Sequence, residues 1–215
     1  MSDQDTRNVS AGQPFQDKLN EIYTRLLQQT SVATANKNSE AAGKRVEQLK
    51  ESRKKLVARA AELADEITKL AGECESSFIE RYAGDQSQPD VSGKLGSLSA
   101  LEHEHKIVTH AVAQITDHLL PKAEIQEIRA VADYSSAQAE SLREVAAERL
   151  QKTQELIAGA KEHEGELAFD PAQTVSGVLQ AQAAQLDTVA QNQRNIAHER
   201  EQEYLKMQRQ QSKVF

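Results

Sequence analysis

The residues most able to do chemistry are four histidines in the middle of the chain, His103, His105, His110 and His118, which lie beside several acidic residues. Imidazole and carboxylate groups are common zinc ligands, so this group raises the hypothesis of a metal-dependent enzyme. His103 and His110 are seven residues apart, however, which on a helix is about 10 Å and too far for both to bind one ion unaided. We therefore expect a solvated polar face here, with no metal and no cofactor.

No other group of residues indicates catalysis. Cys74 is the only cysteine, and it falls at a position where we expect a small, buried apolar side chain rather than a reactive thiol. The glycines lack the order of a phosphate-binding loop, and the serines and histidines show no arrangement typical of a catalytic triad. We expect no catalytic residues and predict that the protein is not an enzyme.

The composition indicates long helices rather than a round globular core. Aromatic residues make up 4% of the 215 residues, tryptophan is absent, and there are 9 glycines and 4 prolines. Such a composition is typical of coiled coils. The formal net charge of −7 gives no support to nucleic-acid binding. We see no signal peptide and no membrane-spanning run, so we expect a cytoplasmic protein.

A seven-residue repeat between residues 42 and 77 gives the clearest structural prediction. Leu49, Leu56, Leu63 and Leu70 are spaced by seven, and Val46 begins the companion register. An apolar seam that recurs every 3.5 residues on a helix is buried by a second helix lying along it. The repeat therefore predicts helix-to-helix packing.

We predict an all-α fold, an elongated coiled coil or helical bundle of long helices with one short N-terminal helix. Apolar spacing, glycines and prolines place the boundaries. The expected segments are a disordered N-terminus (1–12), a short amphipathic helix (13–35), a long heptad helix (39–82), a loop (83–97), a long helix kinked or broken near Pro121 (98–164) and a C-terminal long helix (171–211).

The apolar seams of these helices are the candidate partner-binding residues. The later seams are rich in alanine or interrupted by polar residues, so pairing within the chain would bury the leucines poorly, and we expect partner helices to complete the bundle. The candidates are Val46, Leu49, Leu56, Leu63, Ile67, Leu70, Leu98, Leu101, Val108, Val112, Ile115, Leu119, Leu179, Leu186, Val189 and Ile196.

Short motifs between residues 78 and 145 resemble a known family. They are Phe78-Ile79-Glu80-Arg81, Pro89-Asp90 with Lys94-Leu95, Leu119-Leu120-Pro121, and Ile128-Arg129-Ala130-Val131. This pattern is similar to that of the smallest shoulder subunit of dynactin. The resemblance implies a non-catalytic helical subunit that bundles with dynamitin and the large dynactin subunit. It also implies a role in dynein-based microtubule transport and a location on the cytoskeleton.

These observations predict a structural adaptor subunit of a cytoplasmic assembly, with other coiled-coil proteins as partners; self-association stays open. The alternative is a membrane-remodelling or peripheral-membrane helical dimer, since an amphipathic N-terminal helix before long kinked helices is a layout such proteins share. The first helix has no net charge, because Asp17 and Glu21 balance Lys18 and Arg25. It should therefore attract anionic lipid only weakly. We therefore expect no membrane contact and expect that helix to pack onto the bundle.

Overall fold

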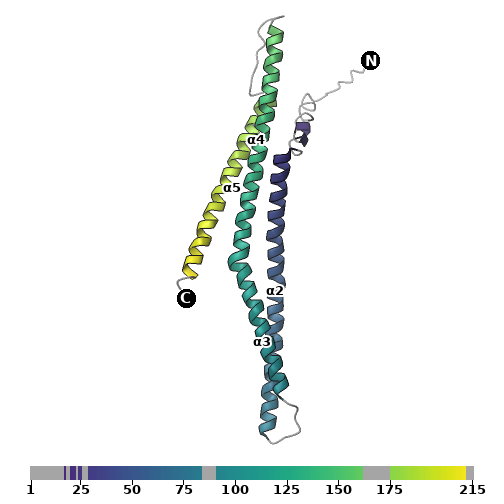
Figure 1. The fold of residues 1–215 in the computed structure, drawn as a ribbon, viewed down its shortest axis with the longest axis vertical. Coiled ribbons are helices and arrows are strands. Elements are labelled where there is room, and N and C mark those ends of the chain that lie inside the picture. Colours follow the sequence, from purple (N-terminus) through teal and green to yellow (C-terminus); the bar gives the residue numbers. More distant parts are fainter. Residues whose placement is uncertain are drawn as a thin grey trace, which may run out of the picture. The chain divides into compact units, whose positions relative to one another are not determined.

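The computed structural model describes residues 17, 20–22, 24–25, 29–83, 91–161 and 175–211 (Figure 1). The described residues are helical almost throughout and include no strand, which confirms the all-α helical-bundle prediction. The elements are α2 (Thr30–Tyr82), α3 (Val91–Gln114), the π-helical turn η1 (Ile115–Leu119), α4 (Leu120–Lys161) and α5 (Val175–Gln211). The chain divides into a hairpin unit, Gly43–Glu124, and a terminal unit, Met1–Ala42 with Ile125–Phe215.

Helix α2 begins nine residues earlier than the predicted start at residue 39. It runs from Thr30; residues 17, 20–22 and 24–25 before it are also helical, whereas Gln29 forms a bend. The polar stretch 34–38 does not interrupt α2, because it lacks glycine and proline and its side chains bond along the helix. Asn36 Nδ2 donates to Glu40 Oε1 at 2.9 Å. The predicted disordered segment 1–12 lies outside the described residues.

Helix α3 begins at Val91, inside the predicted loop 83–97. Gly93 and Gly96 suggested a loop, yet both lie in the first turns of the helix. A glycine lowers helix propensity by only about 1 kcal/mol, which packing of the neighbouring residues offsets. Val91 is buried and Lys94 half-buried. Residues 84–90 of that predicted loop lie outside the described part of the chain.

Pro121 does not end the helix, because α3, η1 and α4 follow one another without a gap. The distortion is instead the π-helical turn directly before the proline, where the Leu120 N–H donates to the carbonyl of Ile115. Proline lacks an N–H, and its ring clashes with the carbonyl four residues earlier, so a wider turn accommodates it. Helix α4 is described as far as Lys161, and α5 begins at Val175; residues 162–164 of the predicted long helix and 171–174 of the predicted last helix lie outside the described residues.

The core of the hairpin unit follows the seven-residue repeat. From Val46 to Ser77, buried and half-buried side chains of α2 recur at spacings of three and four residues. Arg59 Nη2 lies 3.0 Å from Glu104 Oε1, and Lys94 Nζ lies 3.7 Å from Glu73 Oε2, so α2 and α3 run antiparallel. One buried cluster closes the open end of this pair: Val46, Leu49, Ile115, Leu120 and Ala123.

Alanines form the contact between α4 and α5 in the terminal unit. Each helix carries three almost fully buried alanines spaced by seven residues. They are Ala132, Ala139 and Ala146 on α4 and Ala183, Ala190 and Ala197 on α5. Ser176 Oγ donates a 2.9 Å hydrogen bond to the carbonyl of Ala146, a contact that requires close backbones. These small side chains let the two helices approach more closely than a leucine seam would.

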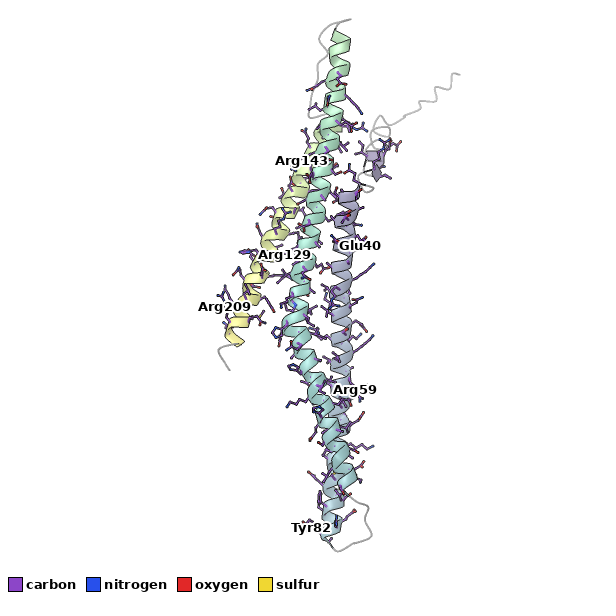
Figure 2. All side chains as sticks on the ribbon, in the orientation of Figure 1. Glu40, Arg59, Tyr82, Arg129, Arg143 and Arg209 are labelled. Atoms are coloured by element: carbon purple, nitrogen blue, oxygen red, sulfur yellow. The ribbon has the colours of Figure 1, made fainter. Side chains whose placement is uncertain are left out.

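Ion pairs along one edge fix the register of α4 and α5. Arg129 Nη2 lies 2.6 Å from Glu201 Oε2, and Arg143 pairs with Asp187 (Figure 2). Residue numbers rise on α4 as they fall on α5, so the two helices are antiparallel. These pairs are exposed and contribute little stability singly, but they favour one register over a slipped one.

Replacing Gly96 by alanine should stabilise the protein by about 0.5–1 kcal/mol, because Gly96 is helical and an added Cβ would meet no atom within 4 Å. Urea unfolding measures the change. The control is the reverse type of substitution, Ala100→Gly, at an exposed position of the same helix. It should lower the free energy of unfolding by a similar amount. If Gly96→Ala destabilised the protein instead, this would contradict helical structure at residue 96 and favour the loop predicted from the sequence.

Replacing Ala139 by leucine should destabilise the protein by about 1–3 kcal/mol, because a larger side chain would force the closely packed helices apart. Ala139 is fully buried. Ala147→Leu, at an exposed position of the same helix, is the matched control and should change the urea midpoint little. Equal midpoints for the two variants would show that α4 and α5 are not in close contact.

Candidate partner-binding surface

The predicted seam of α2 is packed within the hairpin unit. Val46, Leu49 and Leu63 are buried, and the candidates between and beyond them are half-buried. Side chains of the same chain supply much of this cover, since Leu56 packs on the cluster that joins Val46 to Ile115. The expectation that pairing within the chain would bury these leucines poorly does not fit this packing. Their contact with a partner stays a prediction.

The predicted seam of α3 holds as far as the π-helical turn and then shifts by one residue. Val108 and Ile115 are buried, whereas Leu119 is 44% exposed and Leu120 is buried in its place. A π-helical turn adds one residue to the repeat, so the position that faces the core moves from residue 119 to 120. The other three candidates are half-buried, namely Leu98, Leu101 and Val112.

The predicted seam of α5 divides into a buried and an exposed part. Leu179 is buried and Leu186 half-buried, and both pack on the core of the terminal unit. Val189 and Ile196 lie outside that core, because the buried line of α5 continues through the alanines to Tyr204. The seven-residue spacing of these alanines was visible in the sequence. The larger residues Val189 and Ile196 lie beside them on the exposed side of the helix, and their contact with a partner stays a prediction.

Three apolar side chains on α5 form the candidate site, which we call the α5 stripe. Val189 is 45%, Ile196 40% and Met207 49% exposed. Their spacings of seven and eleven residues correspond to about two and three helical turns, so the three lie on one face of α5. Glu199, Arg200 and Glu203 are exposed beside them. An apolar line with charged neighbours of both signs is suited to packing against an amphipathic helix that carries charged residues along its flanks.

Arg59 forms ion pairs that join the two helices of the hairpin unit. Arg59 on α2 reaches Glu104 on α3 and also lies near Glu62 and Glu66 of its own helix (Figure 2). The hydrogen bond to Glu104, followed by that to Glu62, raises the pKa of Arg59 above its already high usual value. Arg59 therefore stays protonated and links the two helices.

The histidine group is dispersed around α3 and η1. His103 and His110 are exposed, whereas His105 and His118 are half-buried and His105 occupies a seam position of the hairpin. Within the described ranges, no three His, Cys, Asp or Glu side chains come together in a way that could hold a metal ion.

None of the helices that the structure describes has an apolar stretch long enough to cross a lipid bilayer.

Comparisons of the chain with protein-family models, with curated proteins and with solved structures find no match. Inference about function therefore starts from the surfaces of this chain.

The thiol of Cys74 should be protected in the isolated protein, because the hairpin unit already covers it; its side chain is buried on the α2 seam. We expect its reaction with a thiol reagent to be slower than in the unfolded chain by a factor on the order of 100. As a control, Ser76→Cys in a Cys74→Ser background places the only thiol at an exposed position and should react fast. Fast labelling of Cys74 in the folded protein would show that its cover comes from a partner.

Proposed function

We propose that the chain is a non-catalytic structural adaptor subunit that joins a multi-protein assembly through packing of its helices against partner helices. The α5 stripe carries this proposal. The alanine contact holds α5 against α4 in a fixed register, so Val189 and Ile196 are presented on a firmly placed helix rather than on a loop. A preorganised apolar line lowers the entropic cost of binding.

The partner that fits the α5 stripe is an amphipathic helix of another coiled-coil protein. Apolar anchors would pack against Val189, Ile196 and Met207, basic side chains would face Glu199 and Glu203, and an acidic side chain would face Arg200.

The resemblance of residues 78–145 to the smallest shoulder subunit of dynactin suggests which assembly to test first. On that proposal, dynamitin and the large dynactin subunit are the partners, and the protein is cytoplasmic and associated with the cytoskeleton. The adaptor proposal does not depend on this assignment, because the α5 stripe lies outside the resembling segment and would accept any helix of suitable pattern.

Replacing Val189 and Ile196 together by glutamine should lower partner recovery at least about tenfold, since exposed apolar anchors would be lost. Affinity purification of the full chain from its own cells, followed by mass spectrometry, measures recovery. The folded chain should keep its thermal midpoint, because neither side chain is part of the buried core.

Ile107→Gln is the matched control, as Ile107 is 55% exposed on the hairpin unit; it should leave recovery unchanged. Unchanged recovery with the double variant, or an equal loss with the control, would contradict binding at the α5 stripe. Variants of the α2 seam such as Leu63→Asp are unsuitable for this test, because Leu63 is fully buried and a charge there would unfold the hairpin.

A further inference from the structure

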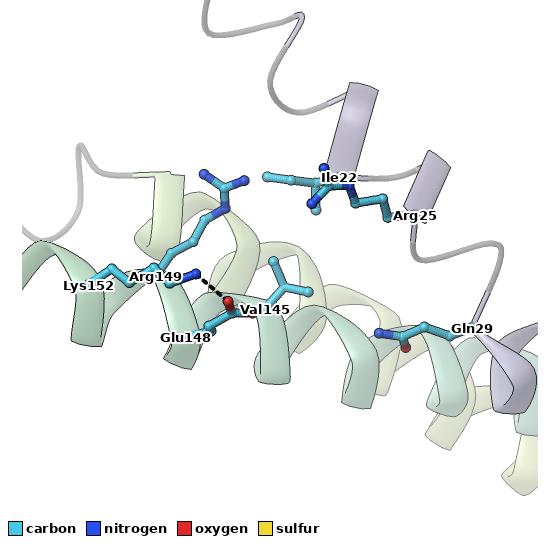
Figure 3. A pocket seen from close by; sticks show the side chains of 7 residues that line it. All are labelled: Ile22, Arg25, Gln29, Val145, Glu148, Arg149 and Lys152. Atoms are coloured by element: carbon cyan, nitrogen blue, oxygen red, sulfur yellow. Dashed lines mark hydrogen bonds and ion pairs between the residues drawn. The ribbon is translucent and has the colours of Figure 1, made fainter.

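A basic cavity lies in the terminal unit, between α4 and an N-terminal segment that precedes α2 and contributes Ile22, Arg25 and Gln29 (Figure 3). Its volume is about 300 Å³, at the small end of the range for ligand pockets. Ile22 and Val145 supply an apolar wall, and the Gln29 amide adds a polar group. Ile22 is itself buried in the core that joins α4 and α5, so this wall is firmly placed.

The charged residues around the cavity have an excess of positive charge. Arg25, Arg149 and Lys152 line it together with one carboxylate, that of Glu148, in a chain whose formal net charge is −7. Lys152 Nζ donates to Glu148 Oε1 at 2.5 Å, and Arg25 pairs with Glu21 at 2.9 Å. Among the described residues, the Arg149 guanidinium has no carboxylate within 4.0 Å.

The electrostatic field in the cavity follows from this imbalance. The pKa of Glu148 is lowered, first by the hydrogen bond from Lys152 and by its charge, and further by the charges of Arg149 and Arg25. Glu148 therefore stays ionised and neutralises one cation only. The remaining excess positive charge favours a second anion.

Two guanidinium groups approach the cavity from different elements. Arg149 extends from α4 toward Ile22, and Arg25 comes from the N-terminal segment (Figure 3). Arg25 already pairs with Glu21, whereas Arg149 has no such partner among the described residues, so a bound dianion would supply the missing negative charge. A guanidinium presents a planar fork of donors that matches the oxygens of phosphate, so phosphate is the anion this pair is best suited to bind.

We propose that this cavity binds a phosphoryl dianion, with Arg149 and Arg25 as the two principal contacts. The dianion could be supplied as inorganic phosphate or as a small phosphate monoester. The apolar wall of Ile22 and Val145 favours the monoester, because its organic group would be removed from water there. Bound ligand would also connect the N-terminal segment to α4 and so stabilise the folded chain.

The experiment titrates the full chain with inorganic phosphate and, separately, with phenyl phosphate by isothermal calorimetry, with chloride holding the ionic strength constant. The proposal predicts saturable binding at one site per chain and a higher thermal midpoint. Tighter binding of phenyl phosphate identifies a monoester site, and equal affinity identifies a site for phosphate alone. Absence of saturable binding of both up to about 10 mM overturns the proposal.

Arg149→Gln should weaken binding at least about tenfold, and Arg149→Lys, which keeps the charge but loses the fork, should lie between Arg149→Gln and the unchanged chain. Arg45→Gln is the control: Arg45 lines a different cavity in the hairpin unit, where Lys55 and two glutamates, Glu47 and Glu51, balance the charge. It should bind like the unchanged chain. Equal weakening by Arg149→Gln and Arg45→Gln, or none by Arg149→Gln, would show that binding depends on net charge or lies elsewhere.

Discussion

Burial of a seven-residue apolar repeat between antiparallel helices is the constraint on which the rest of the structure depends. In a chain so poor in aromatic residues, aliphatic side chains supply most of the apolar contacts, and one helix cannot bury its own seam. The hairpin unit satisfies the constraint with large side chains such as Leu49 and Leu63. The terminal unit combines large side chains such as Leu142 and Leu179 with a line of alanines, where each contact buries less area but the backbones lie closer.

The two solutions leave different surfaces for function. In the hairpin unit, the leucines that first suggested a partner are covered by the same chain. In the terminal unit, alanine takes the buried positions in the middle of α5, between Leu179 and Tyr204, and larger residues such as Val189 and Ile196 are left exposed. The alanine contact thus gives the α5 stripe both its exposure and its fixed position. The arginines of the two units also differ in role. Arg59 joins two helices of the hairpin unit, whereas Arg149 lines a cavity of the terminal unit.

Much of the fold could be predicted from sequence because the heptad signal is local. The spacing of Leu49 to Leu70 was enough to predict α2, and the composition was enough to predict an all-α chain. The misplaced features depend on contacts between segments. Propensity alone did not reveal that packing keeps Gly96 helical. The exchange of Leu119 for Leu120 has a local cause instead, because the π-helical turn accommodates Pro121. The size-weighted apolar pattern pointed to Val189, whereas packing chose Ala190.

We propose that α5 carries the surface through which this chain joins its assembly. Hydroxyl-radical footprinting of the chain alone and within the assembly purified from its own cells tests this most directly, since side-chain labelling follows exposure residue by residue. If α5 is the binding surface, Val189, Ile196 and Met207 should be labelled strongly in the isolated chain and protected in the assembly. Unchanged labelling of these residues in the assembly, with protection confined to the hairpin unit, would contradict it.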